Sequence, residues 1–187
     1  MVLDAWEQLL KELPRPDHRL RLEHVGAMRP DQFARAAELG VTVSIFIDHL
    51  HYWGDVLVDD LFGPEYGSVW AAAGSALAAG QRFTFHNDGP VTPANPLRNM
   101  QDAVTRLSPS GRVVAPQERI PVDAAVRAHT VNAAWQLFSE DHIGPSFPAP
   151  TRIWLCCRQI PSTSSRPSWP TSRCSPPSWR AGRCTGT

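Results

Sequence analysis

Histidine and aspartate side chains follow three β-rich stretches of this sequence. Imidazole and carboxylate groups hold divalent metal ions in proteins, and they also move protons to and from water. A single histidine at a strand end is more often a hydrogen-bonded structural residue, and Asn-Asp-Gly-Pro is also a turn signal. Because three consecutive strand ends carry such residues, a metal site is a second interpretation, which stands next to a purely structural role for each residue. The sets are Glu23-His24, Asp48-His49 with His51, and His86-Asn87-Asp88.

Alternating helical and strand patterns are expected to position these residues. Strands are predicted at 19–25, 41–47 and 82–86, the second because it is rich in β-branched and aromatic residues. Strict alternation of helices and strands indicates an α/β fold with parallel strands, whose carboxyl ends line the active site. The aromatic stretch that follows residue 47 is expected to be a loop. Helices are predicted at 3–13, 30–39, 68–79, 95–107 and 121–138.

Charge is distributed unevenly along the 187 residues although the formal net charge is zero. All 18 acidic residues precede Pro145, and the segment that follows it contains six arginines and no lysine. A basic tail could bind nucleic acid or another acidic partner, which leaves a small non-catalytic α/β protein as an alternative function. The three tryptophans and many prolines of the tail fit such an arm poorly.

The four cysteines, Cys156, Cys157, Cys174 and Cys184, all lie in this tail. Their spacing matches no common zinc motif, and no histidine follows His142. Without an export signal a disulfide framework is not expected. No apolar run has the length of a membrane span, so we expect a cytoplasmic protein without membrane contact.

Several motifs in order resemble amidohydrolase family 3, in the branch of N-substituted formamide deformylases and YtcJ-like metal-dependent hydrolases. The resemblance extends from about Val2 to Gly144, and its motifs are specific only when taken together. They are RLEHV, PDQFARAAELGVTVSI, HLHYWGD, FTFHNDGPVTPANPL, DAVTRL and PQERIPVDAAVRAHTVNAAWQLFSEDHIG.

The resemblance implies a TIM-like (β/α)8 barrel, of which residues 1–144 would form about strands six to eight. His24 would be a metal ligand, and Asp88 would be both a ligand and the catalytic general base. The metal would be a divalent ion, zinc by expectation. Arg106 and Glu118 match positions to which we assign a supporting role. Substrate would contact residues of the loop after strand seven, namely His49, His51, Tyr52 and Trp53.

The family's other metal ligands lie on strands one, four and five, which precede the segment matched here. A zinc site needs three or four protein ligands, so we expect this chain to be an inactive fragment of a hydrolase acting on C–N bonds of small amide-like substrates. A separately encoded N-terminal half could supply the missing ligands. Open strand edges also favour pairing, including homo-oligomer formation.

Residues 145–187 are predicted to be a disordered tail, because a segment of this composition cannot offset the entropy of ordering. The family continues with an Ala-Asp-Leu-x-Val-Leu strand that this chain lacks. Back-translation of 151–157 in the plus-two frame permits that pattern. We therefore interpret the tail as the product of a frameshift near Gly144, and DNA sequencing across these codons would test it.

Overall fold

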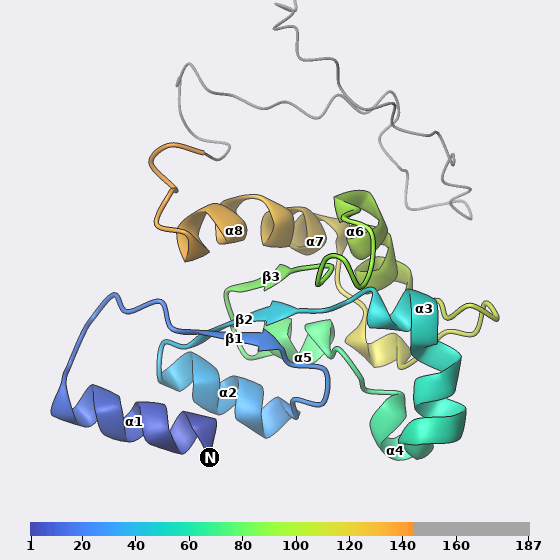
Figure 1. Cartoon of the computed structure of the whole chain (residues 1–187), viewed down its shortest axis with the longest axis horizontal. Helices are drawn as coiled ribbons and strands as arrows, with labels where there is room; N and C mark the ends of the chain where they lie inside the picture. Colours follow the sequence, from blue (N-terminus) through green and yellow to red (C-terminus); the bar gives the residue numbers. More distant parts are fainter. Residues whose placement is uncertain (144–187) are drawn as a thin grey trace, which may run out of the picture. The chain divides into compact units, whose positions relative to one another are not determined.

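The computed structural model describes residues 1–143, in which a three-stranded sheet is surrounded by helices (Figure 1). The strands β1 (Arg21–His24), β2 (Thr42–Ile45) and β3 (Phe83–Phe85) lie in the order β1-β2-β3, and both pairs are parallel. The predicted α/β class with a parallel sheet is therefore confirmed. The tail, its cysteines and the frameshift hypothesis all lie outside the described residues.

Eight α-helices, one π-helix and one 3-10 helix connect and cover the strands in residues 1–143. Pro30 begins α2, and Asn95 caps α6 by accepting a hydrogen bond from Arg98 N at 3.1 Å. The bounds are α1 (Val2–Glu12), α2 (Pro30–Glu38), α3 (His49–Val56), η1 (Leu57–Leu61), α4 (Gly63–Gly67), α5 (Ala73–Ala78), α6 (Pro96–Thr105), η2 (Pro116–Glu118), α7 (Val122–His129) and α8 (Val131–Gln136).

Three of the secondary-structure predictions are wrong. Residues 48–67 are largely helical rather than a loop, because α3, η1 and α4 follow one another there. The helix predicted at 68–79 begins only at Ala73, and residues 68–72 form turns. The last predicted helix is broken at Thr130 into α7 and α8, where the backbone leaves helical geometry (φ −124°, ψ −93°).

The hydrophobic core lies on one face of the sheet, the face to which Val43, Ile45, Phe83 and Phe85 contribute their side chains. Val43 and Ile45 of β2 are fully buried together with Phe83 of β3. Phe33 of α2 packs into the same cluster. Small residues line the helices at this core, which lets the helix backbones approach the sheet closely. They are Ala36, Ala73, Ala76, Ala103, Ala124, Ala125 and Ala128.

The opposite face of the sheet is polar and is covered by Gln136 of α8. Its Oε1 accepts a hydrogen bond from Thr84 Oγ1 at 2.8 Å. Its Nε2 donates to Thr42 Oγ1 at 2.6 Å and to the Val43 carbonyl at 3.0 Å. These bonds attach α8 to both β2 and β3 and satisfy polar groups that would otherwise be buried without partners.

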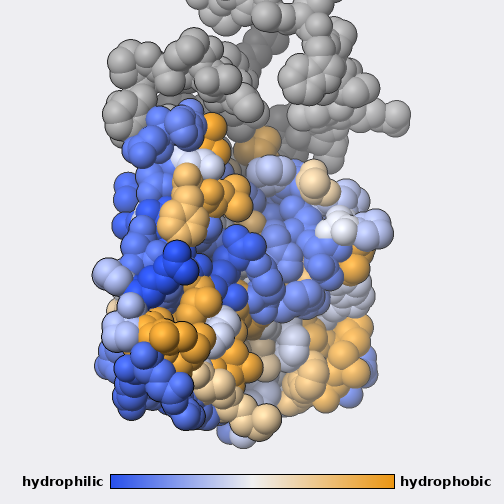
Figure 2. Space-filling model, turned by 60° about the vertical axis from the view of Figure 1, so that its left-hand side comes forward, coloured by the Kyte–Doolittle hydropathy of each residue, from blue (hydrophilic) through white to orange (hydrophobic). Residues whose placement is uncertain are grey.

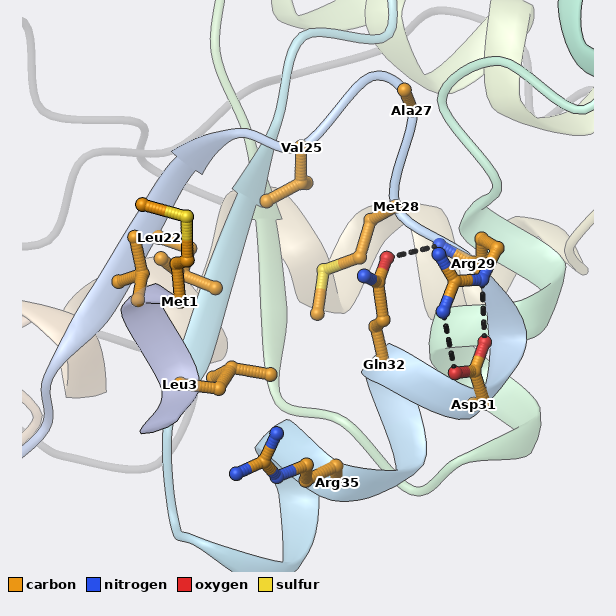
Figure 3. Close-up of a pocket in the computed structure, with 11 residues that line it drawn as sticks. Met1, Leu3, Leu22, Val25, Ala27, Met28, Arg29, Asp31, Gln32 and Arg35 are labelled. Carbon is orange, nitrogen blue, oxygen red and sulfur yellow. Dashed lines mark hydrogen bonds and ion pairs between the residues drawn. The ribbon is translucent and has the colours of Figure 1, made fainter. Parts of the chain in front are cut away.

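The face that carries α1 and β1 displays hydrophobic side chains among hydrophilic ones (Figure 2). A groove of about 420 Å³ lies there, with α1, β1 and α2 around it (Figure 3). Leu3, Leu22, Val25 and Met28 give it an apolar lining, and α1 contributes no fully buried residue of its own. None of the helices described in residues 1–143 has the length and apolar character needed to cross a membrane.

Candidate metal centre

The carboxyl ends of the three strands meet at one edge of the sheet, as parallel strands require. The ring of His24, at the end of β1, lies 5.1 Å from the ring of His86 and 6.1 Å from that of His49. Phe46 packs against all three rings at centroid distances of 4.1 to 5.5 Å. The polar residues that follow the three strands therefore form one cluster.

One pair in this cluster joins an imidazole to a carboxylate, with His24 Nε2 at 3.3 Å from Asp88 Oδ2. Both side chains are accessible, with 48% and 41% of their surface exposed. Both residues also have left-handed backbone conformations, with φ of 68° at His24 and 49° at Asp88. Such conformations are uncommon for residues other than glycine and recur at functional sites. The chain thus turns sharply at both positions and directs the two side chains toward each other.

His49 begins α3, and its ring lies 6.1 Å from that of His24. Its Nδ1 accepts a hydrogen bond from Trp70 Nε1 at 3.1 Å, so the ring proton lies on Nε2. Burial, reinforced by His24 and His86, lowers the pKa of His49 to about 4. The ring is therefore neutral at pH 7 and can donate one hydrogen bond. Trp53, one turn further along α3, lies 5.4 Å from the His49 ring.

His51 and Tyr52 lie apart from the pair. Residues two apart on a helix point in nearly opposite directions, so His51 faces away from His49. His51 Nδ1 lies 3.4 Å from Arg98 Nη1 of α6, and burial lowers its pKa. Tyr52 is exposed at the surface, where its ring contacts those of His51 and Trp53. Of the four predicted substrate contacts, the structure brings His49 near His24 and places Trp53 beside His49.

His86 belongs to the cluster, as its place in the strand-end set His86-Asn87-Asp88 predicts, although the family resemblance implied no role for it. Its Nδ1 accepts a hydrogen bond from the Asp88 backbone N–H at 3.1 Å, which ties it to the turn that carries Asp88. Its Nε2 is buried and has no hydrogen-bond partner among residues 1–143, and burial lowers the pKa of the ring. The sequence signal was its position directly after β3, two residues before Asp88.

Arg106 supports the surrounding segments rather than the cluster itself. The buried guanidinium donates hydrogen bonds to the carbonyls of Trp70 at 2.9 Å, Ala71 at 3.0 Å and Val114 at 2.6 Å, and burial lowers its pKa to about 10. Because Trp70 contacts His49, Arg106 holds the backbone on which that contact depends.

Glu118 supports the fold in a similar way. It accepts two hydrogen bonds from Ser75, from the backbone N–H at 2.7 Å and from the hydroxyl at 2.6 Å. These bonds join η2 to α5 on the core side of the sheet.

The donor atoms present fit part of a metal site. Two ligands on a tetrahedral zinc ion at about 2.1 Å lie about 3.4 Å apart, and the His24–Asp88 separation is 3.3 Å. Within residues 1–143 no group of three or more histidine, cysteine, aspartate or glutamate side chains is arranged to hold a metal ion. The described residues therefore offer two ligands out of the three or four that zinc requires.

Two solved structures that resemble this chain in fold are metal-dependent hydrolases. An uncharacterized metal-dependent hydrolase from Pyrococcus furiosus matches 75% of this chain at 28% identity with a TM-score of 0.57. One from Pyrococcus horikoshii OT3 shares the fold, with a TM-score of 0.61 over 76% of the chain at 23% identity. This chain covers 27% and 28% of those two proteins, respectively.

The sequence profile of the amidohydrolase family matches residues 1–149, and the chain belongs to that family. The Arabidopsis thaliana protein LONG AFTER FAR-RED 3 is 29% identical over 149 residues, which are 79% of this chain and 26% of that protein. N-substituted formamide deformylase from Arthrobacter pascens is 30% identical over 137 residues, 72% of this chain and 24% of the enzyme. The chain thus spans about a quarter of these relatives, and the predicted family is confirmed.

Proposed function

We propose that this chain forms about strands six to eight of a (β/α)8 barrel in a hydrolase acting on C–N bonds of small amide-like substrates. Family membership and the relative named N-substituted formamide deformylase support the reaction class. The observation that carries the site is the 3.3 Å separation of His24 Nε2 and Asp88 Oδ2 at neighbouring strand ends. In this proposal these two side chains hold a divalent metal ion, zinc by the chemistry of its donors.

When bound, the metal would polarise the substrate carbonyl and lower the pKa of the attacking water. Asp88 is accessible and lies next to His24, the other proposed ligand, so its carboxylate can take the proton from that water. It then returns the proton to the leaving nitrogen as the C–N bond breaks. One proton is transferred twice, and no further acid or base is needed.

The contacts of the substrate are assigned to α3. His49 is neutral and has its proton on Nε2, so it can donate a hydrogen bond to the amide oxygen. Trp53 offers an aromatic surface beside it. His51 and Tyr52 lie further from His24 and would contact only an extended substituent.

Two ligands do not hold a catalytic zinc ion firmly, so we propose that activity requires ligands from outside the described residues. A second chain that carries preceding barrel strands is the partner that fits. The outer edge of β1 has no strand partner in residues 1–143, and the apolar groove lies beside it (Figure 3).

Zinc titration of the purified chain tests the site. Calorimetry should give a dissociation constant in the micromolar range or weaker, and His24→Ala or Asp88→Ala should weaken binding at least tenfold. His142→Ala, an exposed histidine outside the cluster, is the matched control and should bind as the parent does. Zinc that stays bound at one equivalent through dialysis, or hydrolysis of an N-substituted formamide by the chain alone, would contradict the proposal.

A further inference from the structure

Two buried carboxyl groups lie beside the candidate site, and within residues 1–143 neither forms an ion pair with a basic side chain. Asp48 follows β2 and is 1% exposed, and Asp102 of α6 is 2% exposed. The two side chains are within hydrogen-bonding reach of each other. One oxygen of each, Asp48 Oδ1 and Asp102 Oδ2, is buried and receives no hydrogen bond from a donor in the described part of the chain. Because two ionised carboxylates have only acceptors, this contact requires a proton between them.

Asn87 connects this carboxyl pair to the turn that carries Asp88. Its Nδ2 donates to Asp48 Oδ2 at 2.6 Å and to Asn99 Oδ1 at 3.0 Å, and its Oδ1 accepts from Asn99 Nδ2 at 3.0 Å. Its carbonyl accepts from Thr92 Oγ1 at 2.6 Å. Asn87 is thus fixed from three segments, and Asp88 is the next residue.

We propose that Asp48 and Asp102 share one proton, and that the resulting pair positions Asp88 by holding Asn87 against α6. Asp102 carries the proton and donates it to Asp48, which keeps the negative charge and accepts the Asn87 amide. Asp48 and Asp102 are positioning residues, since Asp48 accepts its hydrogen bond from Asn87 and the pair acts on Asp88 through that residue. This role in positioning rests on the proposed function of Asp88, whereas the shared proton does not.

The surroundings of the pair explain this assignment. Burial, increased by the charge of Asp48, raises the pKa of Asp102 to about 8. Burial also raises the pKa of Asp48, but hydrogen bonds from Asp102 and Asn87 oppose that shift, so the charge resides on Asp48. The other charged or titratable groups that act on the pair are Arg98 of α6 and His51 of α3.

Because of the shared proton, the free energy of unfolding should fall as pH rises. A folded-state pKa above the unfolded value means that the folded chain holds a proton that the unfolded chain releases. Stability is therefore fully present below the unfolded pKa of about 4 and falls as pH rises toward 8. Over that range the group should reduce the folding equilibrium constant by about tenfold per pH unit.

The variant Asp102→Asn tests the proton directly, because the amide has the same shape and donates without titrating. Urea unfolding from pH 5 to 9 should lose this slope in Asp102→Asn and keep it in Asp123→Asn, an exposed aspartate of α7. Infrared spectra at pH 7 should show the carbonyl stretch of a neutral carboxylic acid in the parent and not in Asp102→Asn. An unchanged slope or an absent band would overturn the proton assignment, as would elemental analysis that finds a cation bound at this pair.

Positioning is tested by NMR of the His24 ring and the Asp88 carboxyl. Asp102→Asn should leave both sets of resonances near their parent positions, whereas Asp102→Leu should shift them because Asp48 loses its donor. If Asp102→Leu does not fold, Asp102→Asn is compared with Asp48→Asn instead. Each of these variants places an amide donor between the two side chains, so both should leave the resonances of His24 and Asp88 near their parent positions. Resonances that move equally in Asp102→Asn and Asp102→Leu would overturn the positioning role without affecting the zinc test of His24.

Discussion

At the scale of single residues, Gly26 determines how closely an aromatic ring can approach the cluster. A Cβ atom at this position would clash with Cε2 of the Trp70 indole. The Gly26 carbonyl accepts a hydrogen bond from the Ala71 backbone N–H at 2.8 Å, which brings the two segments together. The indole of Trp70 then donates to His49 Nδ1 at 3.1 Å. The absence of a side chain at Gly26 therefore leaves room for the indole that donates to His49.

Gly26→Ala should displace Trp70 and break its hydrogen bond to His49. Overpacking of this kind costs about 1–3 kcal/mol of unfolding free energy. Urea unfolding measures the loss, and the indole N–H resonance of Trp70 should move. Gly89→Ala is the control, since a Cβ there meets nothing within 4 Å. Equal stability of the two variants would show that Trp70 is not held by this contact.

The residue types at the strand ends could be predicted from the sequence, but their contacts could not. His24 and Asp88 follow strands whose pattern is clear, so their meeting at one edge is a consequence of parallel pairing. The contact of Asp48 with Asp102 depends on where α6 packs, and no local pattern encodes that. His86 was visible in the sequence, but its buried, unpaired Nε2 depends on tertiary packing.

At the scale of elements, the helical segment after β2 is stabilised by contacts that are distant in sequence. Asp55 of α3 accepts hydrogen bonds from Ser108 Oγ at 2.7 Å, Ser110 N at 2.9 Å and Arg112 Nη2 at 2.9 Å. These contacts join α3 to the turn that follows α6. The sequence of 48–56 predicted a loop because the tertiary contacts that favour a helix here lie more than fifty residues away.

Asp55→Ala should release this turn and destabilise the chain by roughly 1–2 kcal/mol at pH 7. The hydrogen bond from Ser108, more than any other contact, lowers the pKa of Asp55 to about 2. A lowered folded-state pKa stabilises above the unfolded value of about 4, and this contribution is lost as pH falls toward 2.

Thermal unfolding at pH 7 and pH 2 measures this dependence. The difference between parent and Asp55→Ala should be present at pH 7 and shrink at pH 2. Asp59→Ala is the control, because Asp59 is more exposed and pairs only with Arg112 among the described residues. A difference that persists unchanged at pH 2 would argue against the ionised carboxylate as the source.

At the scale of the whole molecule, the two edges of the sheet differ. On β3, Asn132 Nδ2 of α8 donates to the outward-facing Phe83 carbonyl at 2.8 Å, so that edge is covered at this point. On β1, the carbonyls of Leu20 and His24 accept bonds from β2, which leaves the backbone groups of Arg21 and Glu23 facing outward. The sequence predicted open edges on both sides, and only packing of α8 could reveal the difference.

Arg21→Pro separates pairing at this edge from folding. Proline removes the outward N–H of Arg21 and is tolerated at the first residue of an edge strand, so the chain should fold as the parent does. Leu22→Pro is the matched control, because Leu22 faces β2 and its substitution should unfold the sheet. Circular dichroism distinguishes the two variants before any partner is added.

The partner for this test is the Arthrobacter pascens deformylase without the segment that aligns with this chain. Mixed with the parent chain and zinc, it should regain hydrolysis of an N-substituted formamide, and hydrogen exchange at Arg21 and Glu23 should slow as the edge becomes paired. With Arg21→Pro both effects should weaken at least tenfold, since the edge loses a donor and its strand pairing. Full activity with Arg21→Pro, or unchanged exchange at Glu23 in an active mixture, would place the docking surface elsewhere than the β1 edge.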